Sequence, residues 1–516
     1  MAKKVYVTVP IYYASGNPHI GHAYTTILAD TFSGYNKLMG NQVQFTAGMD
    51  EHGQKIYEKA ISAKLEPQVF VDQIYKNFDQ LWKKLNIDYT LFIRTTDKKH
   101  EKVIQDVFSS LLKNNYLYQG EWTGLYCVQC EENYALSDTY VKDGIRYCKV
   151  GHPITEKKEA TYFLKLSKFQ TWIEQYYQSH PHFISPISRS KELINNFIKP
   201  GIEDLSITRT KISWGVPTKE DPNHVLYVWI DALMCYLTAM GYGQKDDHIY
   251  QEFWKDENTD IVHVIGKEIT RFHGIYWPII LKCLNVRLPN RLISHGWIVT
   301  KEGKMSKSLG NVVDPNQYID QYGSDALRYY LTKVIPIDND GVFAHEHFIE
   351  TFNADLANNY GNFVSRSLGM INKYANGIIP KCETKLDESS LAISKATDDL
   401  LKELPQLVHD FQFITLIEKI MNLASMGNKY IEDTKPWNLV KENKTKELNL
   451  FLNVVMSLAV NLSVLLSPIL KTGTLMALKQ LNINLKDVKL DQLSNLTRYQ
   501  NHKVNTSTPI YLRLTK

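Results

Sequence analysis

The fold is decided by residues 4–24, which read KVYVTVPIYYASGNPHIGHAY. Lys4 to Ile11 alternates in hydrophobicity and is rich in β-branched residues, which predicts a first strand. The residues that follow predict a helix from His19 to about Met39, with Asn17 as its cap, and Gln42 to Ala47 reads as the next strand. The chain therefore begins with a β-α-β unit, which is typical of an α/β fold with a doubly wound parallel sheet.

A pair of histidines lies where such a unit binds its ligands, after the carboxyl end of a strand. His19 and His22 are three residues apart in the predicted first helical turn, where free N–H groups and the helix dipole favour phosphate. Gly21 has no side chain, so an adenine could approach the backbone there. Taken alone, the pair is equally consistent with a helix cap and two surface histidines.

A second motif, Lys304-Met305-Ser306-Lys307-Ser308, lies far along the chain. Its lysines are flexible point charges that suit a departing pyrophosphate, although a solvated basic loop is the default interpretation of such a segment alone. In this order, the two motifs resemble those of the class I aminoacyl-tRNA synthetases. The resemblance implies an ATP site with Mg2+ in which His19, His22, Lys304 and Lys307 are catalytic. The implied ATP-binding residues are His19, Gly21, His22, Lys304, Met305, Ser306, Lys307 and Ser308.

Three cysteines and a histidine have the spacing of a zinc site: Cys127, Cys130, Cys148 and His152. They complete a tetrahedral set without an open position, which favours a structural knuckle over a catalytic metal. His152 fits least well, because three residues separate it from Cys148 where two are more usual, and four unliganded side chains are the alternative. Cysteines gathered in this way indicate a reducing compartment, and we expect the cytoplasm.

Changes of pattern along the 516 residues predict several domains. We expect residues 1–115 and 224–290 to form the two halves of the catalytic nucleotide-binding domain, with a strand over His224 to Trp229. Residues 116–223 would be an inserted domain that carries the zinc knuckle. Residues 291–340 would link the catalytic domain to an all-α helical bundle, residues 341–516.

The segment from Leu450 to Leu470 is apolar enough to suggest a membrane helix. Polar residues recur along it at every fourth position, namely Asn449, Asn453, Ser457 and Asn461. This polar stripe favours a buried helix of the bundle, so no membrane partner is expected.

Five short segments narrow the resemblance. They are Pro10-Ile11-Tyr12-Tyr13, Gly48-Met49-Asp50-Glu51-His52-Gly53, Tyr227-Val228-Trp229-Ile230-Asp231-Ala232, Gly266-Lys267-Glu268-Ile269 with Phe272-His273, and Lys435-Pro436-Trp437. They closely resemble the methionyl-tRNA synthetases, and the likeness runs from the first strand to about Pro468.

This resemblance implies the methionine site. Asp50 would hold the α-amino group, and the side-chain pocket would be lined by Ile11, Tyr13, Trp229, Ala232, Leu233, Tyr236, Ile269 and His273. A thioether packs well against aromatic rings, which Tyr13, Trp229 and Tyr236 supply. Trp229 could equally be a core residue, and its expected place at the end of a strand favours the site.

The resemblance also implies that Asn362, Arg366 and Trp437 read the CAU anticodon of tRNA(Met). Bases of an unpaired loop are read by stacking and by hydrogen bonds to their edges. Without the resemblance, Asn362 and Arg366 would be a solvated helix face and Trp437 a core residue.

The expected activity is therefore the activation of methionine with ATP and its transfer to tRNA, by a monomer. The net charge of +4 permits an RNA partner without requiring one. Synthetases for leucine, isoleucine or valine share both ATP motifs but resemble one another in a much larger editing insertion. A catalytically silent tRNA-binding paralogue would lack the histidines or Lys307, and small adenylyltransferases lack a long helical C-terminal domain.

Overall fold

The computed structural model describes residues 2–130, 132–134, 136–301, 303–304 and 313–515. Met305, Ser306, Lys307 and Ser308, which were predicted to bind ATP, lie outside the described residues, and of Lys304 the backbone is described. The chain forms two compact units, each taken by itself below. The first comprises Met1–Pro18, Gln42–Lys83 and Asp88–Trp297, and the second His19–Asn41, Lys84–Ile87 and Ile298–Lys516.

The first unit is built on a parallel sheet, as predicted. Its strand order, among the described residues, is β3 (Leu91–Arg94), β2 (Gln42–Asp50), β1 (Lys4–Tyr13), β13 (Thr259–Gly266), β14 (Arg291–His295) and β9 (Ile184–Ser185). Every neighbouring pair is parallel. The order changes direction between β1 and β13, which is the switch point at which doubly wound sheets bind ligands.

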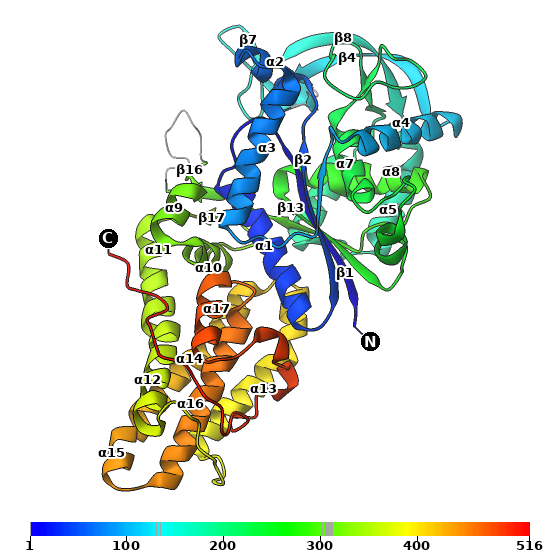
Figure 1. The fold of residues 1–516 in the computed structure, drawn as a ribbon. Coiled ribbons are helices and arrows are strands. Elements are labelled where there is room, and N and C mark those ends of the chain that lie inside the picture. The colour runs from blue at the N-terminus through cyan, green and yellow to red at the C-terminus, as the bar shows by residue number, and fades with distance from the viewer. Residues whose placement is uncertain (1, 131, 135, 302, 305–312, 516) are drawn as a thin grey trace. The chain divides into compact units, whose positions relative to one another are not determined.

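Helices cover both faces of β1 (Figure 1). On one face, the Tyr6 hydroxyl donates to the carbonyl of Tyr236 in α7 (Val228–Thr238) at 2.8 Å. On the other face, the ring of Tyr12 stacks on that of Phe78 in α3 (Pro67–Lys84), with 5.7 Å between centroids. The unit also contains α2 (Gln54–Ser62), α4 (Lys98–Lys113), α5 (Gln170–Ser179), α6 (Ile187–Leu193), η5 (Lys267–Ile269), η6 (Phe272–Tyr276) and α8 (Trp277–Cys283).

The strand expected over His224 to Trp229 is wrong. The strand β12 covers only Val225–Leu226, where it pairs with β11 (Thr208–Arg209), and α7 begins at Val228. Nearly all of α7 is buried, and most of its residues are apolar around the whole helix, with Asp231 and Thr238 as buried polar exceptions. A continuous apolar segment shows no 3.6-residue periodicity, and its aromatic and β-branched residues then favour the prediction of a strand.

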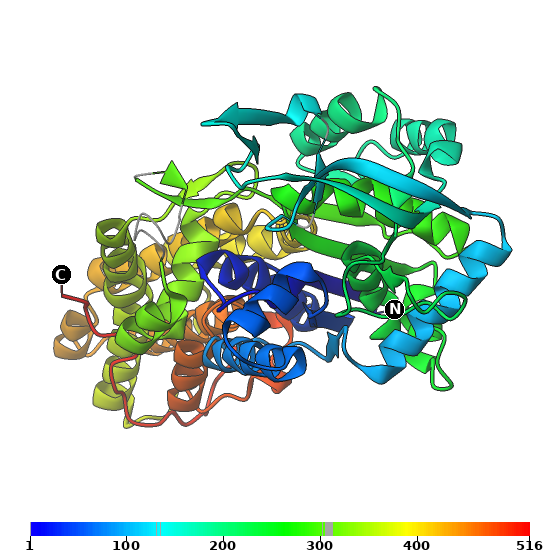
Figure 2. The same cartoon turned by 90° about the horizontal axis from the view of Figure 1, so that it is seen from above.

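The inserted segment forms an antiparallel sheet, drawn in cyan and teal in Figure 2. The strand order is β10 (Leu205–Ser206), β8 (Thr155–Leu164), β4 (Leu117–Cys127) and β5 (Glu132–Tyr134). A hairpin of β6 (Thr139–Lys142) and β7 (Ile145–Cys148) lies beside it in the chain. Cys127 ends β4 and Cys148 ends β7, so two of the predicted ligands stand at strand ends.

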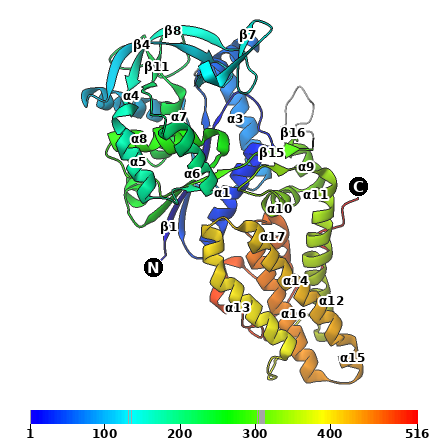
Figure 3. The ribbon, with the colours of Figure 1, turned by 180° about the vertical axis from the view of Figure 1, so that it is seen from behind.

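The second unit is mostly helical (Figure 3). Its helices are α1 (Ile20–Leu38), α9 (Pro315–Tyr322), α10 (Ser324–Val334), α11 (His345–Thr351), η8 (Phe352–Gly361), α12 (Asn362–Ala375), α13 (Glu388–His409), α14 (Phe413–Thr434), α15 (Pro436–Lys441), α16 (Thr445–Leu466) and α17 (Lys471–Gln480). Short strands accompany them in the described part of this unit, namely β15 (Ile298–Thr300), β16 (Gly303–Lys304) and β17 (Gly341–Val342). The helix α1 is tied to this unit by a buried ion pair of 2.7 Å between Asp30 and Arg328 of α10.

The apolar helix α16 is the centre of the bundle, which confirms its prediction as a buried helix. It is long and apolar enough to cross a membrane, but 89% of its apolar window is buried inside the structure. Its polar stripe has a structural purpose: the Ser457 hydroxyl donates to the Leu496 carbonyl at 2.9 Å and the Asn461 amide to the Leu493 carbonyl at 2.7 Å. The stripe therefore anchors the C-terminal segment.

Candidate active site

The predicted methionine residues of the first unit gather around the carboxyl ends of β1 and β2. In the register of these strands Ile11 pairs with Gly48 and Tyr13 with Asp50. A side chain at position 48 would not fit, since an added Cβ would lie 2.6 Å from the carbonyl oxygen of Ile93. The backbone N–H of Ala14 donates to the Asp50 carbonyl at 2.8 Å, which joins the two strand ends.

The helix α7 supplies the apolar side of the site. Ile11, Ala232, Leu233 and Tyr236 are buried in one cluster, against which the half-buried Trp229 and Ile269 pack. The Trp229 ring stacks on Phe272, with centroids 3.5 Å apart and planes 5° from parallel. Trp229 is thus at the edge of the cluster rather than inside it. Phe272 belongs to one of the motifs that carry the family resemblance, but it was not predicted to line the site.

Tyr236 and His273 form a buried polar pair within this apolar cluster. The Tyr236 hydroxyl lies 2.8 Å from Nε2 of His273, and Nδ1 of the same ring lies 3.1 Å from the carbonyl oxygen of Ile269. Burial lowers the pKa of His273 to about 4, so the ring is neutral at pH 7. The apolar cluster therefore contains a neutral hydrogen-bonding pair at this point.

Arg209 is a buried residue beside the site that the sequence argument missed. Its guanidinium lies over the Tyr227 ring at 4.2 Å, and its Nη1 donates to the Ser206 hydroxyl at 2.8 Å. Nη2 has no hydrogen-bond partner within the described part of the chain. A lone arginine in the short strand Thr208–Arg209 belongs to no motif and gives no periodic signal, which is why the sequence did not reveal it.

The histidine motif begins α1 in the second unit, and the cap is His19 rather than the predicted Asn17. The Gly21 N–H donates to Nδ1 of His19, and the His19 N–H donates to Nδ1 of His22, each at 3.1 Å. The two rings stack with centroids 3.8 Å apart. Burial and the neighbouring His19 lower the pKa of His22. Because both Nδ1 atoms accept hydrogen bonds, the neutral rings carry their protons on Nε2.

The four predicted metal ligands come together in the inserted domain. The ligand atoms of Cys127, Cys130, Cys148 and His152 all lie within 4.8 Å of one another. The sulfur of Cys148 is 3.9 Å from that of Cys127 and 3.8 Å from that of Cys130, and Nδ1 of His152 is 3.3 Å from the Cys130 sulfur. Three sulfurs and one imidazole nitrogen could hold a metal ion here.

Comparison with known proteins establishes the family. The family model described as tRNA synthetases class I (M) matches residues 5–153 and 146–368. A methionine–tRNA ligase of Ureaplasma parvum is 47% identical over 99% of this chain and 98% of its own length. The chain belongs to the methionyl-tRNA synthetase family. It is therefore an enzyme of the ligase class.

Further relatives of this synthetase agree. The methionine–tRNA ligase of Enterococcus faecalis is 42% identical over 99% of this chain and 77% of its own length. The solved structure of Mycobacterium tuberculosis methionyl-tRNA synthetase in complex with methionyl-adenylate superposes with a TM-score of 0.92 at 32% identity, covering 99% of this chain and all of that one. The free-state structure of the same protein gives a TM-score of 0.85 at 29% identity.

The predicted anticodon residues of this synthetase lie on two helices of the second unit. Asn362 and Arg366 are one turn apart on α12, and Trp437 is in the first turn of α15. Arg366 pairs with Glu432 at 3.6 Å, at the end of α14 just before α15. The side chain of Trp437 is 41% exposed, which excludes the alternative that it is a core residue.

Proposed function

We propose that the chain activates methionine with ATP to methionyl-adenylate and then transfers the methionyl group to the 3′ end of tRNA(Met). The observation that carries the proposal is the site at the ends of β1 and β2, where a carboxylate, Asp50, pairs in register with Tyr13 while α7 supplies an apolar and aromatic wall. This arrangement suits an α-amino acid with a long, polarizable, uncharged side chain, because the amino group can pair with the carboxylate and the side chain can pack against the apolar wall.

In this proposal Asp50 binds the α-amino group of methionine. The thioether occupies the pocket formed by Ile11, Tyr13, Trp229, Ala232, Leu233, Tyr236, Ile269 and His273. The Tyr236–His273 pair sets the polarity of the pocket where it meets the side chain of methionine. A neutral pair tolerates a sulfur atom but offers no opposite charge to an acidic or basic side chain. The amino acid's carboxylate then attacks the α-phosphorus of ATP, with no covalent enzyme intermediate.

ATP would be held by the two sequence motifs. His19 and His22 carry their protons on Nε2 and can donate them to phosphate oxygens, and Gly21 leaves room for the adenine. Lys304, Met305, Ser306, Lys307 and Ser308 would follow the pyrophosphate as it leaves with Mg2+. Lys307 is the residue to which we assign the stabilisation of developing phosphate charge.

Zinc is the metal that the cysteine cluster fits. A tetrahedral zinc with Zn–S bonds of about 2.3 Å separates its sulfur ligands by about 3.8 Å. The Cys148 sulfur lies 3.9 Å and 3.8 Å from those of Cys127 and Cys130, which agrees with that geometry. Zinc bound there would fold the inserted domain, residues 116–223, and would take no part in the reaction.

The anticodon site would use Trp437 to stack on a base, and Asn362 and Arg366 to bind base edges or phosphates. We assign the catalytic domain to residues 1–115 and 224–290, the linking segment to 291–340 and the anticodon-binding bundle to 341–516. We also propose that the enzyme acts as a cytoplasmic monomer.

The proposal is tested by charging a tRNA transcript that carries the CAU anticodon. Methionine with ATP and Mg2+ should give methionyl-tRNA, and the reaction should be lost when ATP is omitted. A transcript with a different anticodon is the control and should be charged at least tenfold more slowly. Charging with another amino acid in preference to methionine would overturn the proposal.

A further inference from the structure

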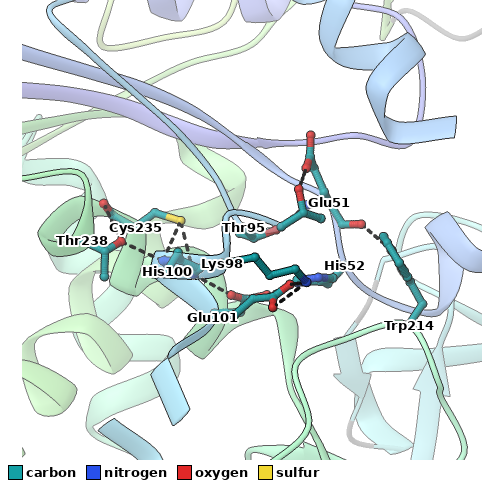
Figure 4. Close-up of polar contacts among 11 residues, drawn as sticks. Glu51, His52, Thr95, Lys98, His100, Glu101, Trp214, Cys235 and Thr238 are labelled. Carbon is teal, nitrogen blue, oxygen red and sulfur yellow. Dashed lines mark hydrogen bonds and ion pairs between the residues drawn. The ribbon is translucent and has the colours of Figure 1, made fainter. Parts of the chain in front are cut away.

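A buried carboxylate in α7, that of Asp231, lies between two buried histidines from different parts of the first unit. The two histidines, His52 and His100, are shown in Figure 4, and none of the three residues was assigned a role from the sequence. Asp231 Oδ2 lies 2.7 Å from Nδ1 of His52, and its Oδ1 lies 2.8 Å from Nε2 of His100. All three side chains are almost fully shielded from water. His52 follows β2, and His100 lies in α4.

The contacts of Asp231 keep it charged. Burial alone would raise the pKa of Asp231, but the two histidines more than offset burial, and the pKa is lowered. Nδ1 of His100 also lies 2.7 Å from the hydroxyl of Thr238, which is about two turns further along α7 than Asp231. His100 is therefore attached to α7 at two points, and Asp231 joins three elements of the unit.

The residues around His52 are held just as firmly. Both backbone polar groups of Glu51 are hydrogen-bonded. Its N–H donates to the Thr95 hydroxyl at 2.9 Å, and its carbonyl accepts from Nε1 of Trp214 at 2.6 Å. The buried Glu51 carboxylate accepts from Nε of Arg94 at 2.7 Å. The Gly53 N–H donates to the Trp214 carbonyl at 3.1 Å. Asp50 thus stands immediately before a segment that is fixed on every side.

We propose that Asp231, with His52 and His100, is the positioning group for methionine recognition. It fixes α7, which carries Trp229 and Ala232 on either side of Asp231, against the segment that carries Asp50. None of the three touches methionine in this proposal. This network sets the distance between Asp50, which binds the amino group of methionine, and α7, which binds its side chain. Amino acids whose side chains have another length therefore fit less well. The inference rests on the proposed methionine site.

A stabilising role alone would predict something different. If the network only stabilised the fold, its loss would lower the melting temperature and the fraction of active enzyme, so the apparent kcat would fall while both KM values stayed close to wild type. A positioning role predicts a selective effect, in which the KM for methionine rises and the KM for ATP does not.

The test uses pairs of variants that differ in one hydrogen bond. In His52→Asn, the amide nitrogen takes the place of Nδ1, so the bond to Asp231 is retained, whereas His52→Ala removes it and His52→Gln moves the donor. In the same way, His100→Gln retains a donor in the place of Nε2 and His100→Ala does not. Asp260→Asn is the control, because Asp260 pairs with Arg291 at 2.6 Å at the amino end of β13.

Methionine-dependent exchange of pyrophosphate into ATP gives the readout for the full-length enzyme. His52→Ala and His100→Ala should raise the KM for methionine roughly 10- to 100-fold, with the KM for ATP within about twofold of wild type. His52→Asn and His100→Gln should recover most of the loss, and Asp260→Asn should match wild type. Rates with leucine relative to methionine should increase in the two alanine variants.

Equal effects of His52→Asn and His52→Ala would overturn the inference, as would parallel changes in both KM values. If His52→Ala does not fold, the comparison of His52→Asn with His52→Gln decides in its place. Absence of methionine-dependent exchange in the wild type would instead contradict the proposed function. The two failures are therefore distinguishable.

Discussion

The hydroxyl of Tyr236 lies 2.8 Å from Nε2 of His273, while Nδ1 of that ring lies 3.1 Å from the carbonyl oxygen of Ile269. A carbonyl can only accept a hydrogen bond, so Nδ1 carries the ring proton and Nε2 accepts the proton of the tyrosine hydroxyl. This pair can exist in the pocket only while His273 is neutral. Burial lowers the pKa of His273 to about 4, which maintains that state at neutral pH.

Acid should therefore destabilise the folded enzyme through His273. In the unfolded chain a histidine takes up its proton near pH 6.5, and in the folded chain His273 does so only near pH 4. Between these values the unfolded state binds more protons than the folded state. The contribution of neutral His273 to the free energy of unfolding is therefore complete above about pH 6.5 and is lost as the pH falls towards 4. This contribution is on the order of 3 kcal/mol. Denaturant unfolding at pH 7.5, 6 and 5 should show a shallower pH slope in His273→Gln.

The exposed His182 provides the control for that experiment, and His182→Gln should leave the slope nearly unchanged. Part of the slope should remain in His273→Gln, because burial also lowers the pKa of His263. A slope in His273→Gln identical to that of wild type would contradict the assignment of the neutral pair.

Lys307→Ala should slow the activation of methionine by about 100- to 1000-fold, because the lysine is proposed to act on charge that develops as pyrophosphate leaves. The affinity for methionine measured without ATP should stay close to wild type. Single-turnover formation of adenylate and equilibrium binding of methionine measure the two quantities. An equal loss in both would indicate a structural lysine.

Metal analysis should find about one zinc per chain, bound through Cys127, Cys130, Cys148 and His152. Cys148→Ser should lose the metal, because its sulfur lies within 4 Å of both other sulfurs. His152→Ala tests the fourth ligand, and retention of zinc by that variant would remove His152 from the set. A fully active protein that contains no metal would refute the zinc knuckle.

Trp437→Ala should separate the two half-reactions. Exchange of pyrophosphate with methionine should be nearly unchanged, whereas kcat/KM for tRNA should fall roughly 10- to 100-fold, since a stacked base is worth about 1–3 kcal/mol. Leu391→Ala is a matched control, because Leu391 is an exposed apolar residue of α13 in the same unit. A parallel loss of exchange and charging would show that Trp437 is structural.

The parallel sheet could be predicted because β1 and β2 have the local composition of buried strands and the intervening residues have a clear helical pattern. The prediction of a strand at His224 to Trp229 failed for a physical reason, since α7 is buried on nearly all sides and its mostly apolar residues show no clear helical period. That Cys127, Cys130, Cys148 and His152 come together was predictable from their spacing. The cap of α1 was not, because His19 replaces the more usual Asn, Ser or Asp with a ring nitrogen.

The buried hydrogen-bond network around Asp231 could not be predicted from the sequence. His52, His100 and Asp231 are distant in the chain, and nothing in their local sequence reveals that they meet. Arg209 was missed in the same way, whereas Phe272 stands within a motif but was not predicted to line the site. The residues around the pocket that could be named were those within motifs, and their partners from other elements became visible only in three dimensions.

The most direct test of the account is amino-acid-dependent exchange of pyrophosphate into ATP, run with each of the twenty amino acids and without tRNA. Exchange should occur with methionine and should be at least about a hundredfold weaker with leucine, isoleucine or valine, which is what a shaped apolar pocket can achieve. Homocysteine should be accepted to a limited extent, because one missing methyl group is worth only about 1–3 kcal/mol. Exchange that is stronger with leucine, isoleucine or valine than with methionine would contradict the account.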